Sequence, residues 1–184
     1  MGQPLVVSRP CPRRSVLAGL CTLTLGTLGG CLTRVGRTLP VNETTDSVRD
    51  VPRSFDAMPD DAPFARLAVG DRRFVLRPNE KPHSVWLWND SSASRTIPLR
   101  LVLDGGSVVF ERTVTFPVDG VFAVALLEAA DYRLELGKGA DGESVAVDRS
   151  LFDCNDSATD VAIRADGSVD SRVTATTMGC GPLS

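Results

Sequence analysis

Cysteine is the residue type with the widest chemistry in this sequence, which has Cys11, Cys21, Cys31, Cys154 and Cys180. A thiolate is a nucleophile that is readily alkylated, forms disulfides and binds soft metals. The stretch from Ser15 to Thr33, which contains Cys31, has no charged residue. Metal binding by these thiols is disfavoured, because zinc and blue-copper sites need histidine partners or close cysteine spacing, and the sequence has only one histidine, His83. We therefore predict no metal and no cofactor.

The first thirty residues have the order of an export signal. Arg13 and Arg14 precede a weakly apolar run, and that run ends in Leu28-Gly29-Gly30-Cys31. A basic start, a modest apolar middle and small residues before a cleavage point are typical of signal peptides. The paired arginines resemble the twin-arginine export signal. The tetrapeptide before and including Cys31 resembles the lipobox of bacterial and archaeal lipoproteins.

The lipobox resemblance implies that an enzyme cuts before Cys31 and that a lipid is joined to its sulfur. The expected protein is then anchored to membrane lipid through Cys31, on the extracellular face of the cell membrane. An uncleaved transmembrane helix is the alternative, since a span needs about 20 apolar residues. The four glycines of this stretch weaken such a helix, each by about 1 kcal/mol.

An exported chain would keep two cysteines free for each other. Cys11 and Cys21 would leave with the signal, and lipid would occupy Cys31. Cys154 and Cys180 remain as an even pair in an oxidising compartment, which predicts a structural disulfide. In the chain-entropy description, such a bridge stabilises the fold by about 3 kcal/mol.

Catalysis has few candidate residues. His83 is the only histidine, and we expect it at the surface or at a strand edge. The sequence contains no Gly-x-Ser-x-Gly, phosphate-loop or His-Glu-x-x-His motif. Carboxylates are abundant, but four of them precede glycines in expected turns: Asp104, Asp119, Asp141 and Asp166. We therefore predict a protein that is not an enzyme, with a small secreted hydrolase as the least favoured alternative.

Trp86 and Trp88 are two residues apart in an expected strand, so their side chains face the same way. Both could lie in the core. If their face is exposed, the pair is a candidate aromatic platform for a sugar or a partner protein.

Three of the four asparagines start glycosylation sequons: Asn42-Glu43-Thr44, Asn89-Asp90-Ser91 and Asn155-Asp156-Ser157. Glycans on these residues would suit an exterior surface. The alternative is that asparagine simply favours turns beside serine, threonine and aspartate.

Length and composition indicate a single domain. The chain has 184 residues, of which 42% are hydrophobic and 23% charged. Loss of residues 1–30, which hold three arginines and no acid, takes the net charge from −3 to −6. Such an acidic chain is a poor match for nucleic acid. Its preference for arginine over lysine and aspartate over glutamate resembles proteins of halophilic archaea; a GC-rich genome is the alternative cause.

The expected elements follow from hydropathy. Residues 32–62 are polar and rich in proline, which predicts a solvated, disordered linker. From Pro63 onwards apolar residues alternate with polar ones in short runs separated by Asp-Gly turns, which predicts about nine strands and an all-β sandwich or barrel. Arg112 interrupts an apolar face, which predicts a bulge or an end of burial there. We favour a strand over a helix for residues 121–130.

The segment Leu127–Leu134 resembles the entry to strand F of immunoglobulin-like domains, in which a tyrosine turns the corner and bonds to the backbone. Tyr132 would be that tyrosine, and Trp86 or Trp88 would be the core tryptophan. The resemblance implies an immunoglobulin-like antiparallel β-sandwich, although the inter-sheet cysteine pair of that family is absent.

The predicted organisation is a signal peptide over residues 1–30, a lipidated cysteine and linker over residues 31–62, and the sandwich over residues 63–184. The first functional hypothesis is a non-catalytic binding or structural module of the cell envelope, with an unknown protein or glycan partner and no nucleic acid. The second is an extracytoplasmic accessory subunit of a membrane complex or transporter, bound through an exposed sheet edge.

Overall fold

Short β-strands account for nearly all regular structure in this protein. The structure is a computed structural model that describes residues 38–46, 49–74, 79–137 and 142–177. Within these residues the helical turns are short 3-10 turns at Arg72–Phe74 and Arg149–Leu151. The strands are β1 (Val41–Glu43), β2 (Ala65–Val69), β3 (His83–Asp90), β4 (Arg95–Leu103), β5 (Val108–Phe116), β6 (Val121–Leu126), β7 (Tyr132–Leu136), β8 (Glu143–Val147), β9 (Ser157–Arg164) and β10 (Val169–Ala175).

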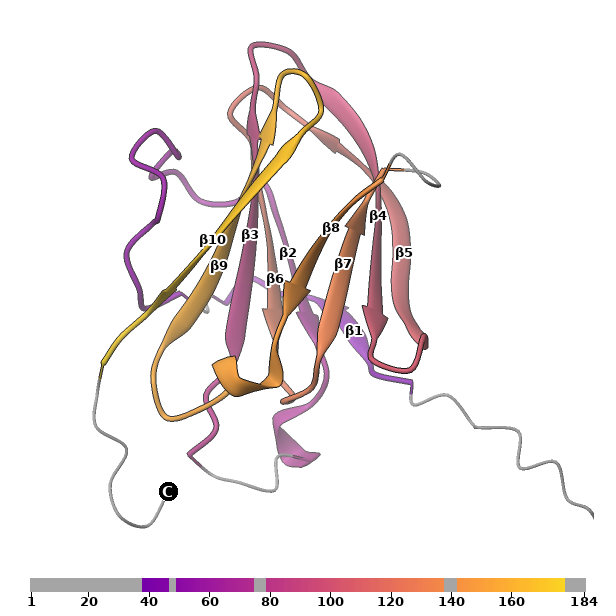
Figure 1. The fold of residues 1–184 in the computed structure, drawn as a ribbon, viewed down its shortest axis with the longest axis vertical. Helices are drawn as coiled ribbons and strands as arrows, with labels where there is room; N and C mark the ends of the chain where they lie inside the picture. Colours follow the sequence, from indigo (N-terminus) through magenta and orange to yellow (C-terminus); the bar gives the residue numbers. More distant parts are fainter. Residues whose placement is uncertain (1–37, 47–48, 75–78, 138–141, 178–184) are drawn as a thin grey trace, which may run out of the picture. The chain divides into compact units, whose positions relative to one another are not determined.

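The strands form two sheets (Figure 1). The six-stranded sheet has the order β1-β2-β6-β3-β9-β10, and the four-stranded sheet has the order β5-β4-β7-β8. The prediction of an all-β, two-sheet fold is therefore confirmed. The prediction that the sandwich is wholly antiparallel is wrong, because β2 runs parallel to β6 and β3 runs parallel to β9.

The main core lies between the two sheets. Leu99, Leu101 and Leu134 of the four-stranded sheet are at most 1% exposed, as are Leu87 and Phe122 of the six-stranded sheet, and all belong to one apolar cluster. Burial of each such side chain stabilises the fold by about 2 kcal/mol. Alternation is clearest in β7, where buried and more exposed positions succeed each other. The central strands β3, β6 and β9 are instead buried on both faces.

The Asp-Gly sequences serve as turns where the structure describes them. Asp104-Gly105-Gly106 connects β4 to β5, and both glycines have φ near 90°, which glycine adopts without strain. Asp166-Gly167 closes the hairpin between β9 and β10. The expected bulge is displaced from Arg112, since the register shifts where Leu101 pairs with Phe110 and Val102 with Val108.

Two further expectations about elements can be compared with the structure. Residues 121–126 form strand β6 rather than the start of a helix, as the sequence favoured. The alternation of Phe74 with Leu76 in the sequence predicts a strand there, but residues 72–74 form a 3-10 turn instead.

The predicted linker over residues 31–62 is wrong for residues 38–46 and 49–62. Leu39 is buried in the main core, and β1 pairs with β2. Val51, Phe55 and Met58 are also buried, in a second apolar cluster on the outer face of the six-stranded sheet. The folded domain therefore starts well before Pro63. Val51, Phe55 and Met58 cover the face of the six-stranded sheet that points away from the main core.

Candidate functional site

Trp86 and Trp88 lie beneath a docked segment, defined here as residues 49–58. The exposed fractions of the two side chains are only 4% and 2%, and the ring centroids of Phe55 and Trp88 are 6.3 Å apart. The burial of both tryptophans that the sequence favoured is therefore confirmed, and the alternative of an exposed aromatic platform is wrong. The assignment of either residue as the tryptophan of the inter-sheet core is also wrong, because both belong to the second cluster on the outer face.

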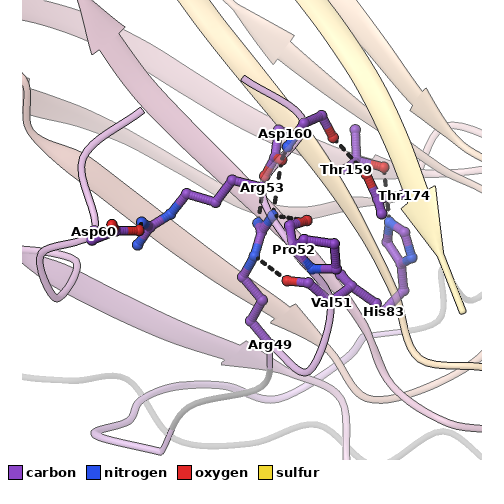
Figure 2. Close-up of polar contacts among 10 residues, drawn as sticks. Arg49, Val51, Pro52, Arg53, Asp60, His83, Thr159, Asp160 and Thr174 are labelled. Carbon is purple, nitrogen blue, oxygen red and sulfur yellow. Dashed lines mark hydrogen bonds and ion pairs between the residues drawn. The ribbon is translucent and has the colours of Figure 1, made fainter. Parts of the chain in front are cut away.

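A buried ion pair fixes the docked segment to the sheet (Figure 2). Asp160 of β9 is fully buried and is in register with Trp86 of β3. Arg49 donates to both carboxylate oxygens of Asp160, with 2.9 Å between Nη2 and Oδ2, and the backbone N–H of Ser54 donates to Oδ2 at 2.6 Å. The guanidinium also lies 5.1 Å from the centroid of the Trp86 ring. Among the described residues, the hydrogen-bond donors to the Asp160 carboxylate all come from the docked segment, and Arg49 supplies the balancing positive charge.

The same guanidinium shapes the segment itself. Its Nε donates to the carbonyl of Val51 at 2.9 Å, and its Nη2 donates to the carbonyl of Pro52 at 2.6 Å. These two hydrogen bonds hold residues 49–52 in a turn around the Arg49 guanidinium. A residue that lacks a multi-donor planar group could not replace Arg49, because the fork geometry serves one carboxylate and two carbonyls together.

The middle of the docked segment contacts β10. Arg172 donates to the carbonyl of Ser54 at 2.9 Å, and its guanidinium lies 4.3 Å from the centroid of the Phe55 ring. The hydroxyl oxygens of Ser54 and Thr174 are 2.6 Å apart. The segment therefore spans the sheet from β3 to β10.

His83 is fully buried, so the prediction of a surface or strand-edge position is wrong. Its Nδ1 lies 2.7 Å from the hydroxyl oxygen of Ser157, and its Nε2 lies 2.8 Å from that of Thr159. Burial lowers the pKa of His83 from 6.5 to about 4, so the ring is neutral at pH 7.

The hydrogen bonds around His83 identify its tautomer. The Ser157 hydroxyl donates a hydrogen bond to the carbonyl of Leu151 at 2.8 Å, so its oxygen accepts a hydrogen bond from the Nδ1–H of His83. Nε2 of the neutral ring then accepts from Thr159. For Ser157 this is the reverse of a nucleophile and its general base, because the serine proton points to the backbone and away from the imidazole. Thr159 does donate to the imidazole, but it is only 1% exposed and His83 is fully buried. The cluster is a satisfied polar group within the fold.

The outer face of the four-stranded sheet is open and charged. A basin of about 860 Å³ lies over it, and the charged residues that line the basin are Arg100, Glu111, Arg112, Arg133, Glu135 and Glu143. Glu135 accepts from Arg100 at 2.7 Å and from Arg133 at 3.0 Å. The hydrogen bond from Arg100, followed by that from Arg133, lowers the pKa of Glu135. Acids and bases balance here, so the face has no excess charge that would attract an anion.

No family model matches this sequence, and the curated proteins contain no match to it. Among the described residues, no cluster of three or more histidine, cysteine or acidic side chains could hold a metal ion. No helix in that part of the chain is long and apolar enough to cross a membrane.

Several predicted site residues lie outside the described residues: Arg13, Arg14, Cys31 and Cys180. Cys154 is disulfide-bonded. Its pairing with Cys180 stays a prediction, as do the export signal and the lipidation.

Sequence reasoning missed Arg49 and Asp160. Two signals were present in the sequence. Val51, Phe55 and Met58 recur at intervals of four and three within the supposed linker, which is the spacing of residues that can share one apolar face. Asp160 is a charged residue within a run that otherwise reads as a buried strand, and a buried charge requires a partner.

Proposed function

We propose that this chain is an exported, lipid-anchored protein of the cell surface, with a non-catalytic module for binding or structure. The observation that carries the proposal is the order of its motifs. Arg13-Arg14, an uncharged run and Leu28-Gly29-Gly30-Cys31 precede a folded domain in which Leu39 is the first buried side chain among the described residues. Durable attachment would need two lipid chains or a diether lipid, because one acyl chain binds only marginally.

The tether in this proposal is short. Eight residue steps separate Cys31 from Leu39, which at full extension span about 27 Å. A lipid on Cys31 would therefore hold the sandwich close to the bilayer. The linker expected from the sequence alone, through residue 62, would have allowed a much greater distance.

We further propose that the sandwich is immunoglobulin-like. The Tyr132 hydroxyl at the start of β7 donates to the carbonyl of Glu128 at 2.8 Å, which is the bond expected of a tyrosine corner. The antiparallel order β5-β4-β7-β8 is consistent with strands C′, C, F and G of that family. The position of β2 beside β6, and the addition of β9 and β10 beside β3, depart from the family pattern.

The open face of the four-stranded sheet supports a binding role. The docked segment covers the outer face of the six-stranded sheet. The outer face of the four-stranded sheet holds the basin, and its acidic and basic side chains are equal in number and partly exposed. A surface with alternating charges suits a protein partner better than nucleic acid. The same face would serve an accessory subunit of a membrane complex, which is the second candidate function.

The anchor can be tested by intact mass spectrometry of the membrane-extracted protein, before and after reduction. The wild-type chain should begin at Cys31, carry a lipid mass and gain two hydrogens when its disulfide is reduced. Cys31→Ser should lack the lipid and leave the membrane fraction. Cys21→Ser makes the same exchange within the predicted signal and should change nothing. A wild-type protein that starts before Cys31, or whose Cys31 is unmodified, would contradict the proposal.

The binding role can be tested by crosslinking in intact cells, followed by capture from detergent-solubilised membranes. Arg100→Glu would break the charge pattern in the middle of the open face, and it should abolish the crosslinks to a partner. Asp56→Arg changes an exposed charge on the docked segment and should leave them intact. Equal crosslinking by both variants would exclude this face as the binding surface.

A further inference from the structure

The three sequons of this chain have very different structural settings. N-glycosylation requires an asparagine amide that an enzyme can reach, together with the hydroxyl of the residue two positions later. Each sequon can therefore be judged by the exposure and hydrogen bonding of these two groups. This comparison rests on the export that we propose above.

Asn89 is fully buried at the end of β3. Its Nδ2 donates to the carbonyl of Ala93 at 2.9 Å and to that of Pro117 at 2.8 Å, which uses both amide protons. Its Oδ1 accepts from the hydroxyl of Ser91 at 2.7 Å, so the sequon is bonded to itself. A sugar on this nitrogen would remove a donor from one of the two carbonyls and displace packed backbone.

The Asn155 sequon is also engaged within the fold. The Nδ2 of Asn155 donates to a carboxylate oxygen of Asp153 at 2.9 Å, and its Oδ1 is buried. The hydroxyl residue of the sequon is Ser157, which is 4% exposed and contacts His83 and the carbonyl of Leu151. An enzyme could not reach that hydroxyl without opening β9.

Asn42 is exposed in β1, the last strand at one end of the six-stranded sheet. Within the described part of the chain its side chain forms no hydrogen bond. Val41 and Glu43 are opposite Val69 and Leu67, which face the main core, so Asn42 points to the outer face.

Thr44 completes the accessible sequon. It follows β1 and its N–H still bonds to the carbonyl of Arg66 at 3.2 Å, so the extended backbone continues through it. Residues two apart in an extended chain point the same way, which presents Asn42 and Thr44 side by side. The threonine hydroxyl has one contact among the described residues, from the N–H of Asp46 at 3.1 Å, and that contact is exposed.

We propose that Asn42 is the N-glycosylation site of this protein and that Asn89 and Asn155 stay unmodified. The sugar donor is an oligosaccharide linked through phosphate to a membrane lipid. The amide nitrogen of Asn42 forms a bond to C1 of the first sugar, and the C1–O bond to phosphate breaks. The lipid phosphate leaves with the electron pair, and the amide proton passes to a base of the transferase.

Glycopeptide mass spectrometry of the full chain tests the proposal. The protein is purified from the membranes of a host that glycosylates a co-expressed reference protein. A glycan is expected on the peptide that contains Asn42, and the peptides of Asn89 and Asn155 should be bare. Asn42→Gln and Thr44→Ala should lose the glycan completely. Thr44→Ser preserves the hydroxyl and should keep it, as should Asn155→Gln.

The same spectra separate this proposal from the proposed function. A chain processed at Cys31 with a bare Asn42 would overturn the glycosylation site alone. A glycan on Asn89 or Asn155 would likewise overturn it. An unprocessed chain that carries no glycan would overturn both the anchor and the glycosylation.

Discussion

At the scale of single residues, His83 shows how burial changes the role of a titratable group. In the folded protein its pKa is about 4, whereas an exposed histidine has a pKa near 6.5. Between these values the unfolded chain binds a proton that the folded chain does not. The free energy of unfolding therefore falls as the pH falls from about 6.5 to about 4, and it is unaffected by this group above that range.

We predict that wild-type protein loses about 2 kcal/mol of stability between pH 6.5 and pH 5 because of His83. Urea denaturation at several pH values measures this loss. His83→Gln has no titrating group here, and whatever its absolute stability, its profile should be flat over the same interval. No other histidine is present to complicate the comparison. A flat wild-type profile would mean that His83 takes up its proton without leaving its buried site.

At the scale of elements, the docked segment and the sheet depend on each other. The segment satisfies Asp160 and covers Trp86 and Trp88, while the sheet supplies the carboxylate and the aromatic rings that hold the segment. Removal of one partner from a buried ion pair leaves an uncompensated charge, which is worse than removal of both. If the ion pair is required, the single substitutions should therefore lower stability more than the double substitution does.

We expect Arg49→Met to reduce stability by about 4 kcal/mol, because Asp160 would remain buried without its cation. The double variant Arg49→Met with Asp160→Leu should recover a large part of this loss. Chemical denaturation of the wild type, both single variants and the double variant gives the coupling energy. Additive effects of the two substitutions would show that the pair is not energetically coupled.

Tryptophan fluorescence provides a second readout for the same variants. The chain has only two tryptophans, and both lie beneath the docked segment. Release of the segment in Arg49→Met should shift their emission to the red and raise acrylamide quenching, even where the sandwich stays folded. Arg133→Met, on the other sheet, is the matched control and should leave the emission unchanged.

At the scale of the whole molecule, the described residues show that the folded domain includes Leu39 and does not start at Pro63. All residues that the structure describes, from residue 38 to residue 177 with three short gaps, belong to one compact unit. The segment between these boundaries contributes β1, buried apolar side chains and Arg49. The sandwich is therefore incomplete without it.

We predict that a variant beginning at residue 38 folds, whereas one beginning at residue 63 does not. The shorter form would lose β1, leave Asp160 without its arginine and expose both tryptophans to water. Circular dichroism and thermal unfolding of the two forms measure this difference. If the shorter form unfolds at the same temperature as the longer one, residues 38–62 do not contribute to the stability of the fold.

The sequence by itself determined the strand pattern. Alternation of apolar residues and the position of Asp-Gly turns are local properties, so the existence and order of β3 to β10 could be predicted, although the start of β9 could not. The Tyr132 hydrogen bond was predictable for the same reason, since donor and acceptor are four residues apart.

Only the tertiary structure decided which faces of these strands are covered and what satisfies their polar groups. The partners of Asp160 and His83 lie 74 or more residues away in the sequence. The cover over Trp86 and Trp88 could not be identified from the sequence, because alternation assigns one face of a strand to the core and leaves the other unassigned. A distant segment with few apolar residues covered that face, and such pairing depends on chain topology rather than on local hydropathy.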